Sequence, residues 1–140
     1  KGVDADVADK VTEENLDSAV AFAKAFAART GAVVAITGAI DIVADDHKAY
    51  CIRNGHPMMS SITGTGCQLS ALTAASSPPT PTSRWRPLPP LCAPWVWPGE
   101  IAHSRLSPLD GNSTYRNYII DAVYNMTPPQ LEEGATYEVR

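Results

Sequence analysis

A glycine-rich turn that runs straight into a helical pattern is the feature that most constrains this chain. Residues 62–67 read Ile-Thr-Gly-Thr-Gly-Cys, and an alanine-rich apolar pattern typical of a helix follows to about residue 75. The first backbone N–H groups of a helix have no partner inside it, and the helix dipole adds partial positive charge there. Such a helix start attracts anions, phosphate above all. The sequence therefore predicts a phosphate cradle at residues 64–66.

Cys67 stands at the mouth of this predicted cradle. The pattern places it at the first helical position, where the helix dipole favours a thiolate. A free cysteine is more often only a small buried residue, and that alternative stays open on the sequence alone.

Size and composition exclude several classes of function. The chain has 140 residues, enough for one domain or a large piece of one, and a net charge of −4. This acidic balance argues against a nucleic-acid surface, and no apolar run reaches the roughly 18–20 residues of a membrane span. The three cysteines and three histidines lack metal-ligand spacing. We therefore expect reduced thiols, a cytoplasmic protein and no metal site built from these residues.

Helix and strand patterns precede the glycine turn. Thr12 is expected to cap a helix that Gly31 closes. The continuous apolar run 32–36 is typical of a strand buried on both faces of a parallel sheet. Two further runs, 40–44 and 48–53, are expected to form a hairpin. The patterns thus predict one helix and three strands before the turn.

Residues 76–98 differ from the rest of the chain. They hold eight of the twelve prolines and all three tryptophans, with neither a helical nor a strand period. Proline inside a helix costs about 3 kcal/mol or more, so we expect an irregular segment here.

Helical patterns resume after this segment. Residues 100–103 read as the end of a helix, and 114–126 form an amphipathic pattern. Its expected apolar side consists of Tyr118, Ile119, Ala122 and Val123. Thr127 before two prolines predicts the start of a last short helix.

Four motifs follow one another in a distinctive order. They are Val-Ala-Ile-Thr-Gly at 34–38 with Asp41, Asn-Gly-His-Pro-Met-Met at 54–59, Thr-Gly-Thr-Gly-Cys at 63–67, and Leu-Asp-Gly-Asn-Ser-Thr-Tyr at 109–115. Over residues 2–75 and 99–140 this set resembles the C-terminal half of hydroxyethylthiazole kinase, a thiamine-pathway family of the ribokinase-like superfamily. The resemblance implies a partial three-layer α/β/α fold. It makes residues 1–140 the C-terminal part of a single kinase domain.

The resemblance also implies a reaction and its residues. The reaction is phosphorylation by ATP, with Mg2+, of the primary alcohol of 4-methyl-5-(2-hydroxyethyl)thiazole, in thiamine biosynthesis or salvage. Gly64, Thr65 and Gly66 would form the anion hole, and Cys67 would stand where most ribokinase-like enzymes have a catalytic aspartate. Thr37 would lie at the ATP phosphates, Gly64 also at the substrate, and the assembly would be a homotrimer.

Simpler structural roles stay open for the remaining candidates. Thr37 would then only end a strand. Asp41 is more readily a turn cap than a ligand of magnesium or nucleotide, and His56 is more readily structural than catalytic.

Two alternatives concern the chain as a whole. Family members are longer, so we expect half an active site here, and a phosphate-binding remnant without catalysis is one alternative function. The other is an interaction module, because Arg84, Pro87 and Pro90 have the spacing of an SH3-domain ligand.

Residues 76–98 also depart from the family pattern. Codons that can encode residues 84–91, when they are translated one base out of frame, encode an alanine-rich sequence typical of a helix. We therefore interpret this segment as a reading-frame error.

Overall fold

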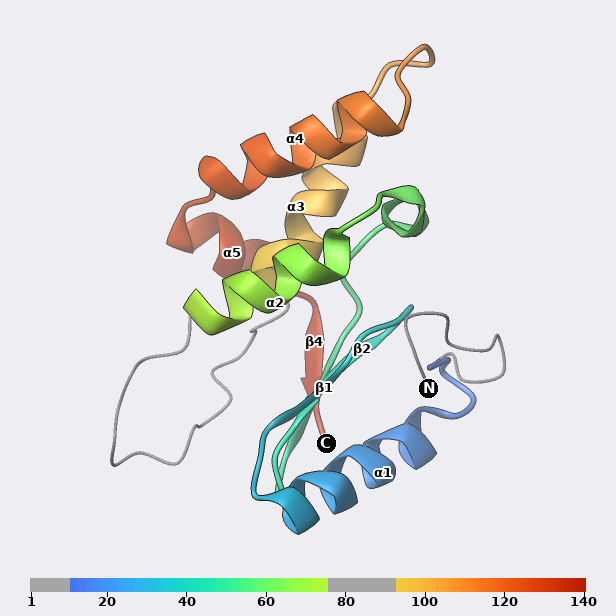
Figure 1. Ribbon diagram of the computed structural model, residues 1–140, viewed down its shortest axis with the longest axis vertical. Coiled ribbons are helices and arrows are strands. Elements are labelled where there is room, and N and C mark those ends of the chain that lie inside the picture. The colour runs from blue at the N-terminus through green and yellow to red at the C-terminus, as the bar shows by residue number, and fades with distance from the viewer. Residues whose placement is uncertain (1–10, 76–92) are drawn as a thin grey trace. The chain divides into compact units, whose positions relative to one another are not determined.

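The computed structural model describes residues 11–75 and 93–140 of the chain (Figure 1). The described residues belong to two compact units, one within 1–53 together with 137–140 and the other within 54–136. The elements in chain order are α1 (Leu16–Thr30), β1 (Val34–Ile36), β2 (Asp41–Ala44), β3 (Ala49–Ile52), the 3-10 helix η2 (Pro57–Ser61), α2 (Thr65–Ala75), α3 (Ala93–Ser104), α4 (Asn112–Tyr124), α5 (Pro128–Gly134) and β4 (Tyr137–Val139).

The first unit contains an antiparallel sheet in the order β1-β2-β3-β4. The hairpin between β2 and β3 is confirmed, with Ile42 opposite Cys51 and Ala44 opposite Ala49. Its turn is closed by Asp45, whose Oδ1 accepts the backbone N–H groups of His47 at 2.7 Å and Lys48 at 2.6 Å. A short side chain that bonds the backbone two or three residues on is a strong local turn signal, which is why the sequence predicted this hairpin.

The prediction of a parallel strand with two buried faces at 32–36 is wrong. β1 pairs antiparallel with β2; its Ala35 is exposed, and Val34 and Ile36 are half-buried. A short apolar run has the same appearance in a central strand and in an edge strand, because the pattern does not record the strand's neighbours.

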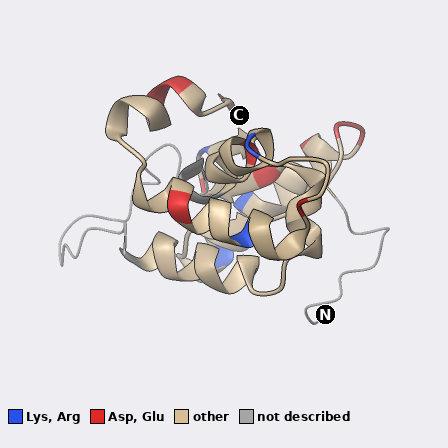
Figure 2. Ribbon diagram, turned by 90° about the horizontal axis from the view of Figure 1, so that it is seen from above, with Lys and Arg blue, Asp and Glu red and all other residues tan. Residues whose placement is uncertain are grey.

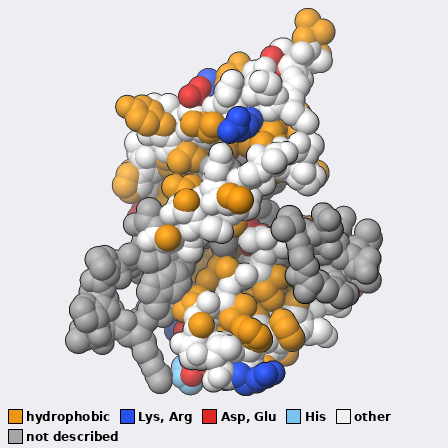
Figure 3. All heavy atoms as spheres, viewed as in Figure 1, with side chains coloured by type: hydrophobic (Ala, Val, Ile, Leu, Met, Phe, Trp, Pro, Cys, Tyr) orange, Lys and Arg blue, Asp and Glu red, His pale blue; other side chains and the backbone are white. Residues whose placement is uncertain are grey.

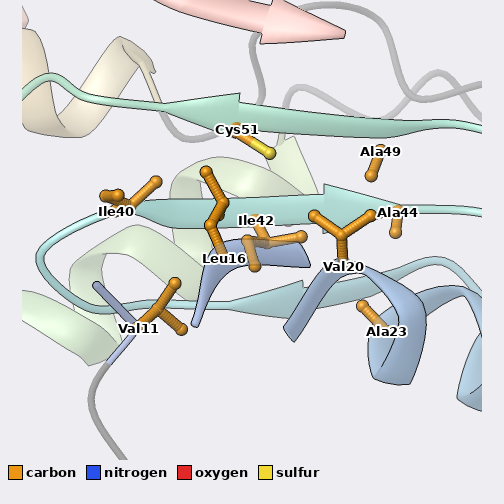
Figure 4. Close-up of a cluster of buried hydrophobic side chains, with 9 residues drawn as sticks. All are labelled: Val11, Leu16, Val20, Ala23, Ile40, Ile42, Ala44, Ala49 and Cys51. Carbon is orange, nitrogen blue, oxygen red and sulfur yellow. The ribbon is translucent and has the colours of Figure 1, made fainter. Parts of the chain in front are cut away.

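α1 covers one face of this sheet (Figure 1). Its residues Leu16, Val20, Ala23 and Ala27 are buried at helical spacing. The side chains of the resulting core are drawn in Figure 4, and the cluster comprises Val11, Leu16, Val20, Ala23, Ile40, Ile42, Ala44, Ala49 and Cys51.

The two ends of α1 differ in how well the sequence predicted them. Gly31 closes the helix as expected, with φ of 70° and its N–H bonded to the carbonyl of Ala27 at 2.8 Å. The prediction of Thr12 as the N-cap is wrong, because Asn15 occupies that position. Asn15 Oδ1 accepts the N–H of Thr12 at 2.7 Å, and residues 13–15 form a turn before the helix. Glu13 in this turn binds Arg53 through two hydrogen bonds of 2.7 and 3.1 Å.

The second unit is helical, and α3 packs against α2, α4 and α5. Its buried residues include Ile62, Leu69, Val96, Pro98, Ala102, Tyr115, Ile119 and Ala122. The predicted helices at 114–126 and after Thr127 are confirmed as α4 and α5. The expected end of a helix at 100–103 is confirmed by α3.

The expectation of an irregular segment is wrong for residues 93–98, which form the first half of α3. Pro98 lies inside this helix and its side chain is fully buried. A proline removes one intrahelical hydrogen bond, and burial of its ring within the unit offsets part of that cost. Residues 76–92, with the SH3-ligand pattern at Arg84 to Pro90, lie outside the described residues.

The surface of the described residues combines scattered charges with exposed apolar side chains. Figure 2 shows charged positions dispersed along ribbons that carry mostly other residues. Phe22 and Phe26 of α1 are 63% and 43% exposed and stack on each other, and Figure 3 shows hydrophobic side chains at the surface. No helix among the described residues is long and apolar enough to cross a membrane.

Candidate functional site

The glycine turn lies between η2 and α2 and ends at Gly64. Its φ of +91° is a left-handed conformation that only glycine adopts without strain. The carbonyl of Gly64 accepts the N–H of Gln68 at 3.1 Å, so Gly64 is the residue before the first helical turn. α2 therefore begins at Thr65, two residues earlier than predicted. Cys67 is its third residue instead of its first.

The first turn of α2 has the properties of an anion site. The backbone N–H groups of Thr65, Gly66 and Cys67 find no acceptor among the described residues. A Cβ placed on Gly64 or Gly66 would meet nothing within 4 Å, so the space beside both glycines is open. Unpaired amides at a helix start, with room for a ligand beside them, are suited to hold the oxygens of a phosphoryl group.

Cys67 is exposed. Its thiol is thus accessible in the same helical turn as the three amides. The alternative of a buried packing role applies instead to Cys51, which belongs to the core under α1 and whose pKa is raised by burial.

Asp41 closes the turn between β1 and β2, as its structural alternative predicted. Its Oδ1 accepts the N–H of Gly38 at 2.8 Å, and its side chain is only 4% exposed. Burial raises the pKa of Asp41 to about 6, although the hydrogen bond from Gly38 partly opposes this. Thr37 is exposed in the same turn. It belongs to the first unit and the glycine turn to the second, so its position at the ATP phosphates stays a prediction.

His56 has the structural role that its sequence context favoured. Its Nδ1 accepts the N–H of Met58 at 3.2 Å at the start of η2. Its ring stacks on His103 with centroids 3.4 Å apart, and His103 in turn meets the edge of Tyr115. Burial and the proximity of His103 lower the pKa of His56, while Glu100 opposes the shift. This side chain therefore serves as a hydrogen-bond acceptor at the start of η2.

Asn54 links three distant segments of the second unit through side-chain hydrogen bonds, a role that the sequence did not predict. Its Nδ2 donates to Glu100 Oε1 at 3.0 Å and to the carbonyl of Gly134 at 2.9 Å. Its Oδ1 accepts the N–H of Thr136 at 2.6 Å, and Glu100 Oε1 also accepts the N–H of Gly55. Because Asn-Gly is a common turn signal, the sequence suggested only a turn here.

Comparison with known proteins decides the family. The profile of the hydroxyethylthiazole kinase family matches residues 1–128. The chain belongs to the hydroxyethylthiazole kinase family. It is similar to the hydroxyethylthiazole kinase of Clostridium acetobutylicum, with 55% identity over 144 aligned residues that cover 99% of this chain and 50% of the relative. Hydroxyethylthiazole kinase 2 of Methanosphaera stadtmanae is 34% identical, over 99% of this chain and 49% of its own.

The fold of the family agrees with this result. A solved hydroxyethylthiazole kinase from Pyrococcus horikoshii OT3 has a TM-score of 0.73, with 23% identity, over 91% of this chain and 48% of its own. This likeness confirms a partial α/β fold. The chain spans about half the length of the curated relatives named above.

The part of the chain that the structure describes contains no preformed cluster of metal-ligating side chains. Among residues 11–75 and 93–140, no group of three or more His, Cys, Asp or Glu side chains is placed to hold a metal ion. The first turn of α2, in contrast, has donors suited to phosphate.

Proposed function

We propose that this chain forms the phosphate-binding part of an enzyme that phosphorylates the primary alcohol of hydroxyethylthiazole with ATP. The observation that carries the proposal is the first turn of α2, where three unpaired backbone amides adjoin the exposed thiol of Cys67. Membership of the family supports this choice of substrate. The family's thiamine-pathway role, ATP and a homotrimeric assembly belong to the same proposal, as does the origin of residues 1–140 in a single kinase domain.

In the proposed reaction, the alcohol oxygen forms a bond to the γ-phosphorus of ATP as the bond to the leaving ADP oxygen breaks. The amides of Thr65, Gly66 and Cys67 hold the oxygens of the transferring phosphoryl group. Cys67 Sγ orients the alcohol and, as a thiolate, accepts its proton late in the transfer. Such a reaction depends mainly on positioning and on charge stabilisation, so the modest basicity of a cysteine suffices.

The remaining ligands follow from the same proposal. Thr37 would contact the ATP phosphates and Gly64 the thiazole alcohol. Mg2+ commonly binds through substrate phosphates with few protein ligands, so it would arrive with the nucleotide. The thiols of Cys51 and Cys67 are free, which is in keeping with a reducing, cytoplasmic setting.

ATP-dependent phosphorylation of hydroxyethylthiazole by this chain tests the proposal. We expect Cys67→Ala to lower turnover by about 10²-fold, as for removal of a positioned proton acceptor. Cys67→Asp should restore part of it, because a carboxylate can take the same proton. Turnover that is unchanged in Cys67→Ala would remove Cys67 from the mechanism. No turnover by a chain that still binds ADP would favour a phosphate-binding remnant.

A further inference from the structure

A cleft of about 450 Å³ lies next to the glycine turn within the second unit. One wall consists of Ser61, Ile62 and Thr63, and Thr63 directly precedes Gly64. The other wall consists of Asn112, Ser113 and Arg116 at the start of α4. Its volume lies in the range of small-molecule sites.

The polar residues of α4 that line this cleft share one face of the helix. Arg116 follows Asn112 by four residues and Ser113 by three, so the three side chains share a helix face. The two walls are joined by hydrogen bonds: Ser61 Oγ donates to Asn112 Oδ1 at 2.9 Å, and Asn112 Nδ2 donates to the carbonyl of Ser61 at 3.3 Å. The cleft is therefore formed before any ligand enters.

The charge in the cleft is positive and unpaired. Arg116 is the one ionised side chain among the six lining residues. It has no ion pair or hydrogen bond to any described residue, whereas Arg53 and Arg140 each bind carboxylates. A free guanidinium presents a planar fork of donors that matches the oxygens of a phosphate group.

Asp110, just before α4, is already engaged by hydrogen bonds. Asp110 accepts the N–H of Ser107 at 2.7 Å, and hydrogen bonds from Ser107 and Thr114 lower its pKa. Asp110 does not line the cleft.

We propose that this cleft is a second phosphate subsite with Arg116 as its ligand. It would bind the phosphate that adjoins the transferring phosphoryl group in the nucleotide. The identity of the nucleotide rests on the proposed function. The amides at the start of α2 begin only two residues after Thr63, which lines the cleft. A polyphosphate can thus span both sites, with its terminal phosphoryl group at α2 and its next phosphate at Arg116.

Binding of ADP, without the acceptor alcohol and at constant ionic strength, tests this subsite. We expect Arg116→Gln to weaken ADP binding by about tenfold, as for the loss of one charge-assisted contact. Arg29→Gln is the matched control, because it removes the same charge from the exposed last turn of α1 and should leave ADP affinity unchanged. Both side chains are exposed, so neither change should alter the unfolding temperature.

Backbone NMR signals identify where the ligand sits. At one subsaturating ADP concentration, the amides of Thr63, Asn112 and Ser113 should shift less in Arg116→Gln than in the unsubstituted chain. Equal ADP affinity of the two chains, or the absence of ADP binding, would overturn the subsite. If the binding of inorganic phosphate depends on Arg116 and the binding of ADP does not, the cleft is a site for free phosphate. That result would overturn the nucleotide assignment.

Failure of the subsite and failure of the proposed function give different results. Normal turnover with normal ADP affinity in Arg116→Gln would refute only the subsite. Arg116-dependent ADP binding in a chain that never phosphorylates hydroxyethylthiazole would refute only the catalytic proposal.

Discussion

The indole ring of Trp97 in α3 lies against the backbone of Gly134 at the end of α5, with no room for a side chain between them. A Cβ on Gly134 would overlap the indole, and its nearest atoms would be Cε2 and Nε1 of Trp97. Nε1 is buried, and no described residue accepts its proton. The close approach of α3 and α5 therefore depends on a glycine at position 134.

Replacement of Gly134 by alanine should destabilise the second unit. Because Trp97 cannot move without disturbing the packing of α3, we expect a loss of about 1–3 kcal/mol in the free energy of unfolding, as for other overpacked sites. Urea unfolding monitored by circular dichroism measures this. Gly66→Ala is the control, since nothing lies within 4 Å of its Cβ and alanine favours a helix by roughly 0.5–1 kcal/mol. Equal destabilisation of both variants would contradict the steric argument.

Gly66→Ala should nevertheless weaken phosphate binding. Cβ atoms in a helix tilt toward its N-terminus, so the new methyl group would enter the space beside the unpaired amides of α2. We predict weaker ATP binding by a chain that is as stable as before or more stable. Calorimetric titration with ATP, without the acceptor alcohol, checks this, and unchanged affinity would show that the transferring phosphoryl group does not bind at this helical turn.

Gly64→Ala should cost stability for a different reason. Its φ of +91° lies in the region that L-residues avoid, although no atom within 4 Å would obstruct a Cβ. We expect a loss of about 1–2 kcal/mol from backbone strain. Comparison of its unfolding midpoint with that of Gly66→Ala separates strain from crowding, because both positions are sterically open.

The buried carboxyl of Asp41 should make stability depend on pH. Its pKa is raised from 3.8 to about 6, so the folded chain binds this proton more tightly than the unfolded chain. Its contribution is therefore fully present below about pH 4 and is lost as pH rises through 6. We predict that the unfolding free energy of the unsubstituted chain, relative to Asp41→Asn, falls by about 2 kcal/mol between pH 4 and 7.5. A constant difference across this range would refute a buried, ionising Asp41.

The stack of His56 on His103 should be visible in titrations. Burial is the main cause of the lowered pKa of His56 and the charge of His103 the second, so His103→Phe should raise that pKa only in part. A lowered histidine pKa stabilises the fold at neutral pH, and this contribution is lost as pH falls through the pKa of the folded state. NMR titration of the His56 ring measures the change. An identical titration curve in His103→Phe would show that the two rings do not interact.

Local signals in the sequence predicted much of the secondary structure. Gly31 ends α1, Asp45 closes a hairpin, and Thr127 before proline starts α5, because each residue acts on backbone groups within four positions of itself. The glycine turn and Cys67 belong to the same class. The helix start after the glycine turn could be predicted because it is a local feature of the backbone, although the helix begins two residues earlier than expected.

The sequence by itself determined the turn between β2 and β3, the end of α1, the start of α5 and, through its ordered motifs, the family. Only the tertiary structure decided that β1 pairs antiparallel, that Pro98 is tolerated in a buried helix, and that Arg116 faces Thr63 across a cleft. It also decided the environment of Asp41, whose burial raises its pKa. These properties depend on which distant segments pack together, and the desolvation and crowding that follow leave no mark on the local pattern of residues.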